Sequence, residues 1–310
     1  MIGSYILKNK DENVRMASRS GGFFSILSDF ILEQSGVVYG CALDDSFQAI
    51  HIRAVTQEQR DRCRESKYVQ SNLMDTYKWV LNDLKHGKKV LFSGTPCQVA
   101  ALRNFCRGFD KNLLCVDIIC HGVPSPMVWK DYLDFCERRY RGKVTTVDFI
   151  NKRKFGWAAH HETITVNNQS YDSTIYTHLF GRHNILRPAC FECPYKNLTR
   201  PGDITIGDAW GIQDANPEMD DNRGVSLVLV NTEVGRCVFD VVRKECEWKE
   251  VSIENYLQRP LISAYSEPPE RAEFWAYYFS HSFEKVIRKY IEPNVFVKAI
   301  RKVKKIVFKR

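Results

Sequence analysis

The chain is organised around the stretch Arg187-Pro-Ala-Cys-Phe-Glu-Cys-Pro-Tyr195, which is followed by Gly202-Asp-Ile-Thr-Ile-Gly-Asp-Ala-Trp-Gly211. The first stretch places Cys190 and Cys193 in a Cys-x-x-Cys pair. Such a pair occurs in thiol redox sites, in zinc sites and in iron–sulfur sites. The second stretch predicts a short apolar strand that ends at the glycines around Asp208. Together they predict a sulfur centre beside the end of a strand.

Two further cysteines follow predicted buried strands. Cys97 comes after Lys89–Phe92, at a strand-to-helix junction where Pro96 suits the first helical turn. Cys120 ends the apolar run that begins at Leu113. Parallel strands end at one edge of an open α/β sheet, where ligands commonly bind. We therefore predict an α/β or mixed α+β fold, with a central, mainly parallel sheet flanked by helices and a C-terminal helical tail. We expect the four sulfurs to meet around one metal centre.

The spacing of the cysteines bears on the kind of centre. A structural zinc site usually has two short knuckles, whereas Cys97 and Cys120 stand 23 residues apart and each lacks a close partner. This pattern favours an iron–sulfur cluster assembled inside the fold, with zinc and unmetallated thiols as the alternatives. The other cysteines lie in apolar or helical runs and are interpreted as small buried hydrophobic residues. They are Cys41, Cys63, Cys106, Cys115, Cys136, Cys237 and Cys246.

The composition is that of a globular protein. Of the 310 residues, 44% are hydrophobic and 26% are charged, and no apolar run approaches the length that spans a bilayer. The N-terminus lacks the pattern of a secretory signal, so we predict a cytoplasmic location. Eleven cysteines in a reducing compartment argue against a disulfide framework and in favour of metal or redox chemistry.

Positive charge is concentrated at the C-terminus. The net charge is +8, and Lys285–Arg310 holds ten of the 45 Lys and Arg residues but one acidic residue. The rest of the chain is close to neutral, so no nucleic-acid partner is predicted. Val295–Arg310 is predicted to be a helix with an apolar face between Lys and Arg residues. It is interpreted either as an interfacial helix on anionic lipid or as a helix packed on the body or on a partner.

Two polar segments are candidates for ligand contact. Ser18-Arg-Ser-Gly-Gly22 opens the predicted helix Phe23–Gln34, where free N–H groups suit a phosphate. The alternative for this segment is an ordinary flexible cap. Ser66-Lys-Tyr-Val-Gln-Ser71 is predicted to be a loop that touches a ligand. Within it, Lys67 would pair with a phosphate or a reduced flavin, or would be a solvated surface lysine.

Each of two aromatic segments also has two interpretations. In Gly207–Gly211, the flanking glycines allow close approach of a flat ligand. In this segment, Trp210 could pack beside an isoalloxazine ring and Asp208 could form a hydrogen bond with that ring. The alternative is a strand end with a buried tryptophan. The basic and aromatic turn Lys152–Trp157 would contact a flavin or a phosphate, or be solvated.

Further elements are predicted from periodicity and caps. The predicted strands are Gly36–Gly40, Ala49–Val55, Lys143–Ile150 and Val225–Val230, and His160 and His161 are interpreted as strand residues. The predicted helices include Asp75–His86, Val99–Cys106, Pro126–Tyr140, Tyr176–Asn184, Thr232–Glu245 and Glu270–Ile291. We predict one domain over residues 1–259, with parts 1–88 and 89–259, and a helical extension over 260–310.

Six motifs in one order resemble the beta subunit family of coenzyme F420 hydrogenases and dehydrogenases, whose relatives include 7-hydroxymethyl chlorophyll a reductase. The resemblance covers about residues 5–250 of the chain. The motifs are Ser20-Gly-Gly22, Ser66-Lys-Tyr-Val-Gln-Ser71, Gly94-Thr-Pro-Cys-Gln98, Ile119-Cys-His-Gly-Val-Pro-Ser-Pro126, Cys190-x-x-Cys193 and Gly202-Asp-Ile-Thr-Ile-Gly-Asp-Ala-Trp-Gly211.

The resemblance implies an iron–sulfur flavoprotein with FAD beside a [4Fe–4S] cluster. The implied cluster ligands are Cys97, Cys120, Cys190 and Cys193. The residues implied near the FAD phosphates are Ser20, Gly21 and Gly22, and those implied along the flavin site are Lys67, Tyr68 and Gln70, with Asp208 and Trp210 as looser assignments.

The implied activity is that of an oxidoreductase. The cluster would pass single electrons, and the flavin would exchange a hydride with F420 or a related conjugated substrate. Many relatives carry an N-terminal ferredoxin cassette that this sequence lacks, so an external ferredoxin, a partner subunit or an upstream segment would exchange electrons with it. Glu65 stands where relatives usually have glycine. Forms like this one occur in surface-polysaccharide settings.

A second hypothesis belongs to another class of protein. The chain would be a non-enzymatic or degenerate scaffold with a zinc or bare-thiol cysteine site, docking a partner or a membrane through its tail. In either case the basic tail suits peripheral contact with the inner membrane surface.

Overall fold

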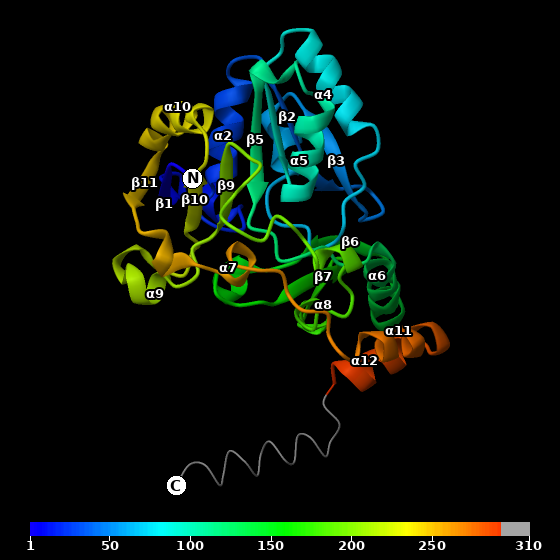
Figure 1. Ribbon diagram of the computed structural model, residues 1–310. Helices are drawn as coiled ribbons and strands as arrows, with labels where there is room; N and C mark the ends of the chain where they lie inside the picture. The colour runs from blue at the N-terminus through cyan, green and yellow to red at the C-terminus, as the bar shows by residue number, and fades with distance from the viewer. Residues whose placement is uncertain (293–310) are drawn as a thin grey trace.

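The computed structural model describes residues 1–292 of the chain (Figure 1). Within these residues, a large sheet has the strand order β11-β1-β10-β9-β5-β4-β2-β3. Its strands are β1 (Gly3–Asn9), β2 (Val37–Leu43), β3 (Ala49–Ala54), β4 (Val90–Gly94), β5 (Leu113–Ile118), β9 (Ile204–Asp208), β10 (Ser226–Val230) and β11 (Cys246–Glu250). Neighbours among β2, β4, β5 and β9 are parallel, and the strands on either side pair antiparallel. The predicted α/β fold with a parallel sheet core is confirmed.

Helices cover both faces of the large sheet. The helices α2 (Phe23–Leu32) and α10 (Glu233–Val242) pack on one face, and α4 (Thr76–Lys85) and α5 (Pro96–Phe105) pack on the other. Successive strand residues point to opposite faces, so Leu91 joins the first of these cores and Phe92 the second. Burial on both faces explains why the parallel strands are continuous apolar runs in the sequence.

A smaller unit lies beside this sheet, in the lower part of Figure 1. It contains a three-stranded antiparallel sheet in the order β6-β7-β8 and helices that share one apolar core with it. These elements are β6 (Val144–Asp148), β7 (Glu162–Val166), β8 (Gln169–Ser173), α6 (Pro126–Tyr140), α8 (Ile175–Gly181), α11 (Arg271–Ser280) and α12 (Phe283–Tyr290).

The described residues also form several short helical segments. The α-helical segments are α1 (Glu12–Met16), α3 (Gln57–Asp61), α7 (Lys152–Phe155) and α9 (Ile212–Ala215). The 3₁₀ segments are Asp110–Asn112, Pro188–Cys190, Pro217–Met219, Arg243–Glu245, Ile253–Tyr256 and Arg259–Leu261. None of the helices in residues 1–292 is both long and apolar enough to cross a membrane.

The structure corrects three sequence predictions. The single helix expected over Glu270–Ile291 is two helices, because the backbone of His281 and Ser282 is extended, with ψ of 161° and 153°. The pair His160–His161 precedes β7 instead of lying in a strand. The strands β1, β8 and β11 form although no strand was predicted there. The predicted helix Val295–Arg310 lies outside the described residues, and the division of the chain at residues 259 and 260 stays a prediction.

Candidate active site

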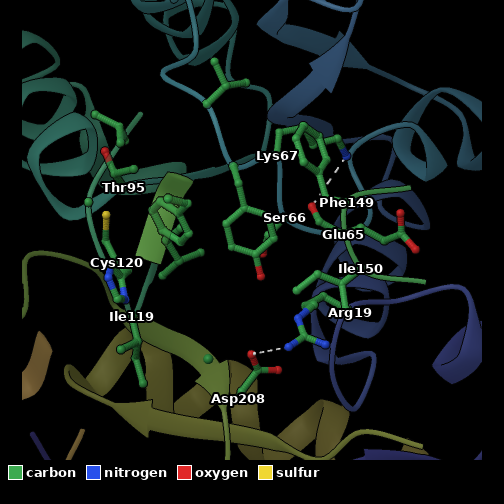
Figure 2. Close-up of a pocket in the computed structure, with 18 of the residues that line it drawn as sticks. Arg19, Glu65, Ser66, Lys67, Thr95, Ile119, Cys120, Phe149, Ile150 and Asp208 are labelled. Carbon is green, nitrogen blue, oxygen red and sulfur yellow. Dashed lines mark hydrogen bonds and ion pairs between the residues drawn. The ribbon is translucent and has the colours of Figure 1, made fainter. Parts of the chain in front are cut away.

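A cavity of about 1260 Å³ lies between the large sheet and the smaller unit (Figure 2). The large sheet contributes Gly94 at the end of β4, Ile119 just beyond β5, and Ile206–Asp208 of β9. The smaller unit contributes Phe149 and Ile150. Binding sites for single small molecules usually enclose about 300–1,000 Å³, so this cavity has room for a large cofactor. Its position at the carboxyl ends of parallel strands agrees with the sequence prediction.

The structure brings the four predicted cysteines into one neighbourhood. Cys97 lies in the first turn of α5 and is exposed, whereas Cys120 lines the cavity just beyond β5. Burial raises the pKa of the Cys120 thiol to about 12; Lys196 acts against this rise, and Cys190 and Cys97 add to it. Burial also raises the pKa of Cys190, with Cys193 and Cys97 adding to the effect. These mutual effects show that residues from three separate segments lie within electrostatic reach of one another.

The chemistry of the donor set bears on which centre it could hold. Among residues 1–292, the structure shows no group of three or more His, Cys, Asp or Glu side chains placed to hold a metal ion. Four cysteine thiolates are the usual ligands of a [4Fe–4S] cluster, in which each binds a different iron. The four cysteines supply that donor set.

The segment that carries Cys190 and Cys193 is attached to β5. The guanidinium of Arg200 donates hydrogen bonds to the carbonyl oxygens of Tyr195 and Ile118, at 2.8 and 2.9 Å. The ammonium of Lys196 donates to the carbonyl oxygen of Cys120. Both cations tie the Cys-x-x-Cys segment to the strand end that carries Cys120.

The segment Ser20–Gly22 fits tightly between strands. Ser20 Oγ donates to the Val225 carbonyl at 2.6 Å, and Gly21 N–H donates to Ser226 Oγ at 2.9 Å. A Cβ on Gly21 would lie 2.3 Å from the Leu7 carbonyl oxygen, so this glycine is required for packing. Ser20 and Gly22 line the cavity, whereas Gly21 is not among its lining residues.

Gly22 determines how α2 begins. It has φ +85° and no side-chain cap, which leaves the first N–H groups of α2 without a side-chain partner at the positive end of the helix dipole. Ser20, Gly22 and Phe23 line the cavity. The arrangement therefore suits a phosphate group at this end of the cavity.

The loop Ser66–Ser71 also reaches the cavity. Lys67 and Tyr68 line it, whereas Gln70 does not and its N–H donates to the Pro124 carbonyl at 3.0 Å. Lys67 is not a solvated surface lysine: its ammonium donates to the carbonyl of Arg62 at 2.9 Å and to that of Arg64. Burial lowers the pKa of Lys67. The ammonium therefore stabilises the turn that precedes Tyr68.

Glu65 places a carboxyl group on the cavity wall (Figure 2). Its φ of 66° is in the left-handed region, which glycine adopts more readily than a residue with a side chain. Burial and the charge of Asp148 raise the pKa of Glu65 to about 7, against the opposing effect of Lys67, Lys152 and Arg19.

Asp208 and Trp210 both line the cavity and share neighbours. Asp208 Oδ1 accepts a hydrogen bond from Trp157 Nε1 at 2.9 Å, and Oδ2 lies 3.4 Å from Arg19 Nη2 (Figure 2). The rings of Trp157 and Trp210 stack with centroids 4.7 Å apart and planes 7° apart. The Arg19 guanidinium carbon lies 5.7 Å from the Trp210 ring centre. These contacts hold one side of the cavity in a fixed arrangement.

Several residues of this site were missed by sequence reasoning. Arg19 lies in the segment Ser18–Gly22. An arginine among small residues just before a helix is the sequence feature that could have identified it as a site residue. Trp157 is fully buried beneath Trp210 and not in a solvated turn. Two cysteines that were interpreted as simple core residues, Cys41 and Cys63, line the cavity. A third, Cys237, is exposed on α10 and not buried.

Comparisons with known proteins identify the fold and the family of the chain. No curated protein matches the chain. Among solved structures, the chain is similar to one in the F420-reducing [NiFe] hydrogenase complex from Methanosarcina barkeri, with a TM-score of 0.57, 16% sequence identity and 82% of each chain covered. The two proteins therefore share a fold. The family model for the C-terminal part of the coenzyme F420 hydrogenase/dehydrogenase beta subunit matches residues 87–255, more than half of the sequence. The chain belongs to the coenzyme F420 hydrogenase/dehydrogenase beta subunit family.

Proposed function

We propose that this protein is an iron–sulfur flavoprotein oxidoreductase in which Cys97, Cys120, Cys190 and Cys193 hold a [4Fe–4S] cluster and the adjacent cavity holds FAD. The observation that carries the proposal is that cysteines from two strand ends and one Cys-x-x-Cys segment lie within electrostatic reach of one another, beside a cavity that Cys120 lines. Family membership supports an oxidoreductase of this type.

The cavity suits FAD in both its chemistry and its size. The phosphates would lie at the α2 N-terminus near Ser20 and Gly22, with Gly21 packing the segment from behind. The flavin ring would lie among Tyr68, Asp208 and Trp210, which line the cavity. When bound, the cluster would supply one-electron transfer and the flavin two-electron hydride transfer.

The chain's own residues connect the protein surface to the cavity. Cys97 is exposed, and Cys120 is on the cavity wall. A cluster held by the four cysteines would therefore lie between the protein surface and the cavity. A ferredoxin or an electron-transfer subunit would therefore dock near Cys97. The solved structure with the same fold belongs to a complex that reduces F420. We propose F420 or a related two-electron carrier as the substrate, and we keep the cytoplasmic location and the link to polysaccharide synthesis as predictions.

Anaerobic purification tests the proposal. The protein should be brown-yellow and contain about four iron and four sulfide per chain, together with FAD that is released on denaturation. Cys190→Ser should abolish the cluster absorbance, because it removes one ligand. Cys237→Ser, on the exposed side of α10, is the matched control and should leave the absorbance unchanged. A colourless protein that contains zinc would contradict the proposal.

A further inference from the structure

Lys196 is a buried lysine without a carboxylate partner in the described part of the chain. The residue is only 6% exposed. Its ammonium donates a hydrogen bond to the carbonyl oxygen of Cys120, which carries only a partial negative charge. Arg200, four residues later, pairs with Asp117 at 3.0 Å, whereas Lys196 forms no such pair with any Asp or Glu of residues 1–292. A buried cation is strongly unfavourable unless an anion offsets its charge.

The ammonium of Lys196 lies within electrostatic reach of the predicted cluster ligands. Burial lowers the pKa of Lys196, and three cysteines act against that fall, namely Cys120, Cys193 and Cys190. Burial raises the pKa of Cys120 and of Cys190, and Lys196 acts against both rises. The ring centre of Tyr265 is also close, 5.7 Å from Lys196 Nζ, but this ring has no net charge. An anion that offsets Lys196 would therefore lie at the cysteines.

A cluster held by the four cysteines would supply this anion. The thiolate ligands of a [4Fe–4S] cluster outweigh the positive charge of its core, so the whole centre is negatively charged. It becomes more negative when it accepts an electron. The reduction potential of such a centre therefore depends on the charges and hydrogen bonds around it. A cation in the protein interior acts more strongly than one in water, so the charge of Lys196 would favour the reduced state.

We propose that Lys196 is the counter-charge of the sulfur centre, and that its buried ammonium stabilises the loaded cluster and raises the reduction potential of that cluster. The inference rests on the proposed function, because it requires a cluster at the four cysteines. The role that it assigns to Lys196 is electrostatic. Another cation at this position can therefore replace the lysine, whereas a neutral hydrogen-bond donor to the Cys120 carbonyl cannot.

Redox titration of the anaerobically purified, full-length protein tests the proposal. The electron paramagnetic resonance signal of the reduced cluster gives its midpoint potential as dithionite is added. Lys196→Gln removes the charge but keeps an N–H donor for the Cys120 carbonyl. Its midpoint potential should fall by at least about 59 mV, which is a tenfold change in the equilibrium constant of a one-electron couple. Lys196→Arg keeps the charge and should titrate close to the wild type. The control is Lys111→Gln, an exposed lysine beside the opposite end of β5, which should leave the potential unchanged.

The cluster-free protein provides a second measurement. Without the anion, burial of the Lys196 ammonium opposes folding. Lys196→Gln should therefore be at least as stable to urea as the wild type when both proteins are free of iron. With the cluster loaded, the same variant should lose its iron to a chelator several-fold faster than the wild type. A side chain with only a structural role would change both states in the same direction.

The outcomes separate this inference from the proposed function. The inference alone is overturned if Lys196→Gln binds iron and sulfide but titrates at the wild-type potential, or if it destabilises the cluster-free protein. If Lys196→Gln does not retain a cluster, retention by Lys196→Arg supports the inference, and loss from both variants overturns it. A wild-type protein that contains no iron and no sulfide contradicts the proposed function itself.

Discussion

Arg200 and Asp117 form an ion pair that is almost completely buried, with Nη2 3.0 Å from Oδ1 and side-chain exposures of 1% and 0%. The second oxygen of Asp117 accepts the N–H of Gly202 at 3.0 Å. Arg200 belongs to the segment that carries Cys193, and Asp117 belongs to β5, which leads to Cys120. The pair therefore fixes two parts of the proposed cluster site relative to each other.

Removing one partner of this ion pair should be strongly destabilising. Arg200→Met leaves the Asp117 carboxylate buried without its cation, and such changes typically cost about 3–5 kcal/mol. Urea unfolding would measure the loss. Replacing both residues, Arg200→Met with Asp117→Leu, should recover much of it, because no unpaired charge remains. The exposed Arg107→Met serves as the control, and an equal small effect at both arginines would contradict the assignment.

Gly21→Ala should destabilise the protein and weaken FAD binding. The added Cβ would lie 2.3 Å from the Leu7 carbonyl oxygen and 2.7 Å from the Ser226 nitrogen, so β1 or β10 must shift. Overpacking of this kind costs about 1–3 kcal/mol. Gly181→Ala is the comparison for stability alone, because a Cβ there meets no protein atom within 4 Å but Gly181 lines the cavity. Thermal unfolding without FAD measures the stability of both variants, and the shift on adding FAD measures its binding to Gly21→Ala and to the wild type. A neutral Gly21→Ala would contradict the prediction.

Glu65→Gly should stabilise the fold. The left-handed backbone of Glu65, with φ 66°, costs a residue with a side chain roughly 1–2 kcal/mol, whereas glycine adopts it without this penalty. The greater freedom of glycine in the unfolded chain offsets part of the gain. A net rise of about 0.5–1 kcal/mol in the free energy of unfolding is therefore expected. The comparison variant is Asn167→Gly, measured in the same way. Asn167 also has a positive φ, at 48°, but does not line the cavity.

Glu65→Gln should change how stability depends on pH. The folded protein raises the pKa of Glu65 from 4.5 to about 7, so the folded state holds this proton more tightly than the unfolded chain. The stability that the proton contributes is full below about pH 4.5 and is lost as pH rises through about 7. The neutral glutamine does not titrate. Unfolding free energies for wild type and Glu65→Gln should therefore diverge in favour of the variant from about pH 4.5 to 8.

The exposed Glu33→Gln is the control for this pH series, because Glu33 does not line the cavity. A constant difference between Glu65→Gln and wild type across the series would show that the Glu65 proton is not linked to folding.

The parts of the structure that local sequence determines were predicted well. At the start of α5, Thr95 and Gln98 form a reciprocal capping box and Pro96 occupies the first turn. This local chemistry determines where α5 begins without any tertiary contact, so the sequence alone places Cys97 in its first turn. The apolar run of β5 likewise placed Cys120 at a strand end.

Elements that depend on distant partners were missed. The strand β11 is largely exposed, and its pairing with β1 joins Tyr5 to Glu250 across nearly the whole chain. The neighbours of Arg19, namely Trp157 and Asp208, are equally remote in sequence. The break between α11 and α12 has no Gly or Pro to announce it, since His281 and Ser282 occupy it. Periodicity within a short window contains no information on such contacts.

The last turn of α12 forms part of the cavity wall. Lys289 and Tyr290, with Ile291 and Glu292 after them, line the cavity, whereas the rest of α12 packs in the core of the smaller unit. A ligand that contacts this turn is therefore linked to the position of the helix. A partner that shifts α12 would change the affinity of the cavity, and a ligand in the cavity would change the affinity for that partner by the same factor.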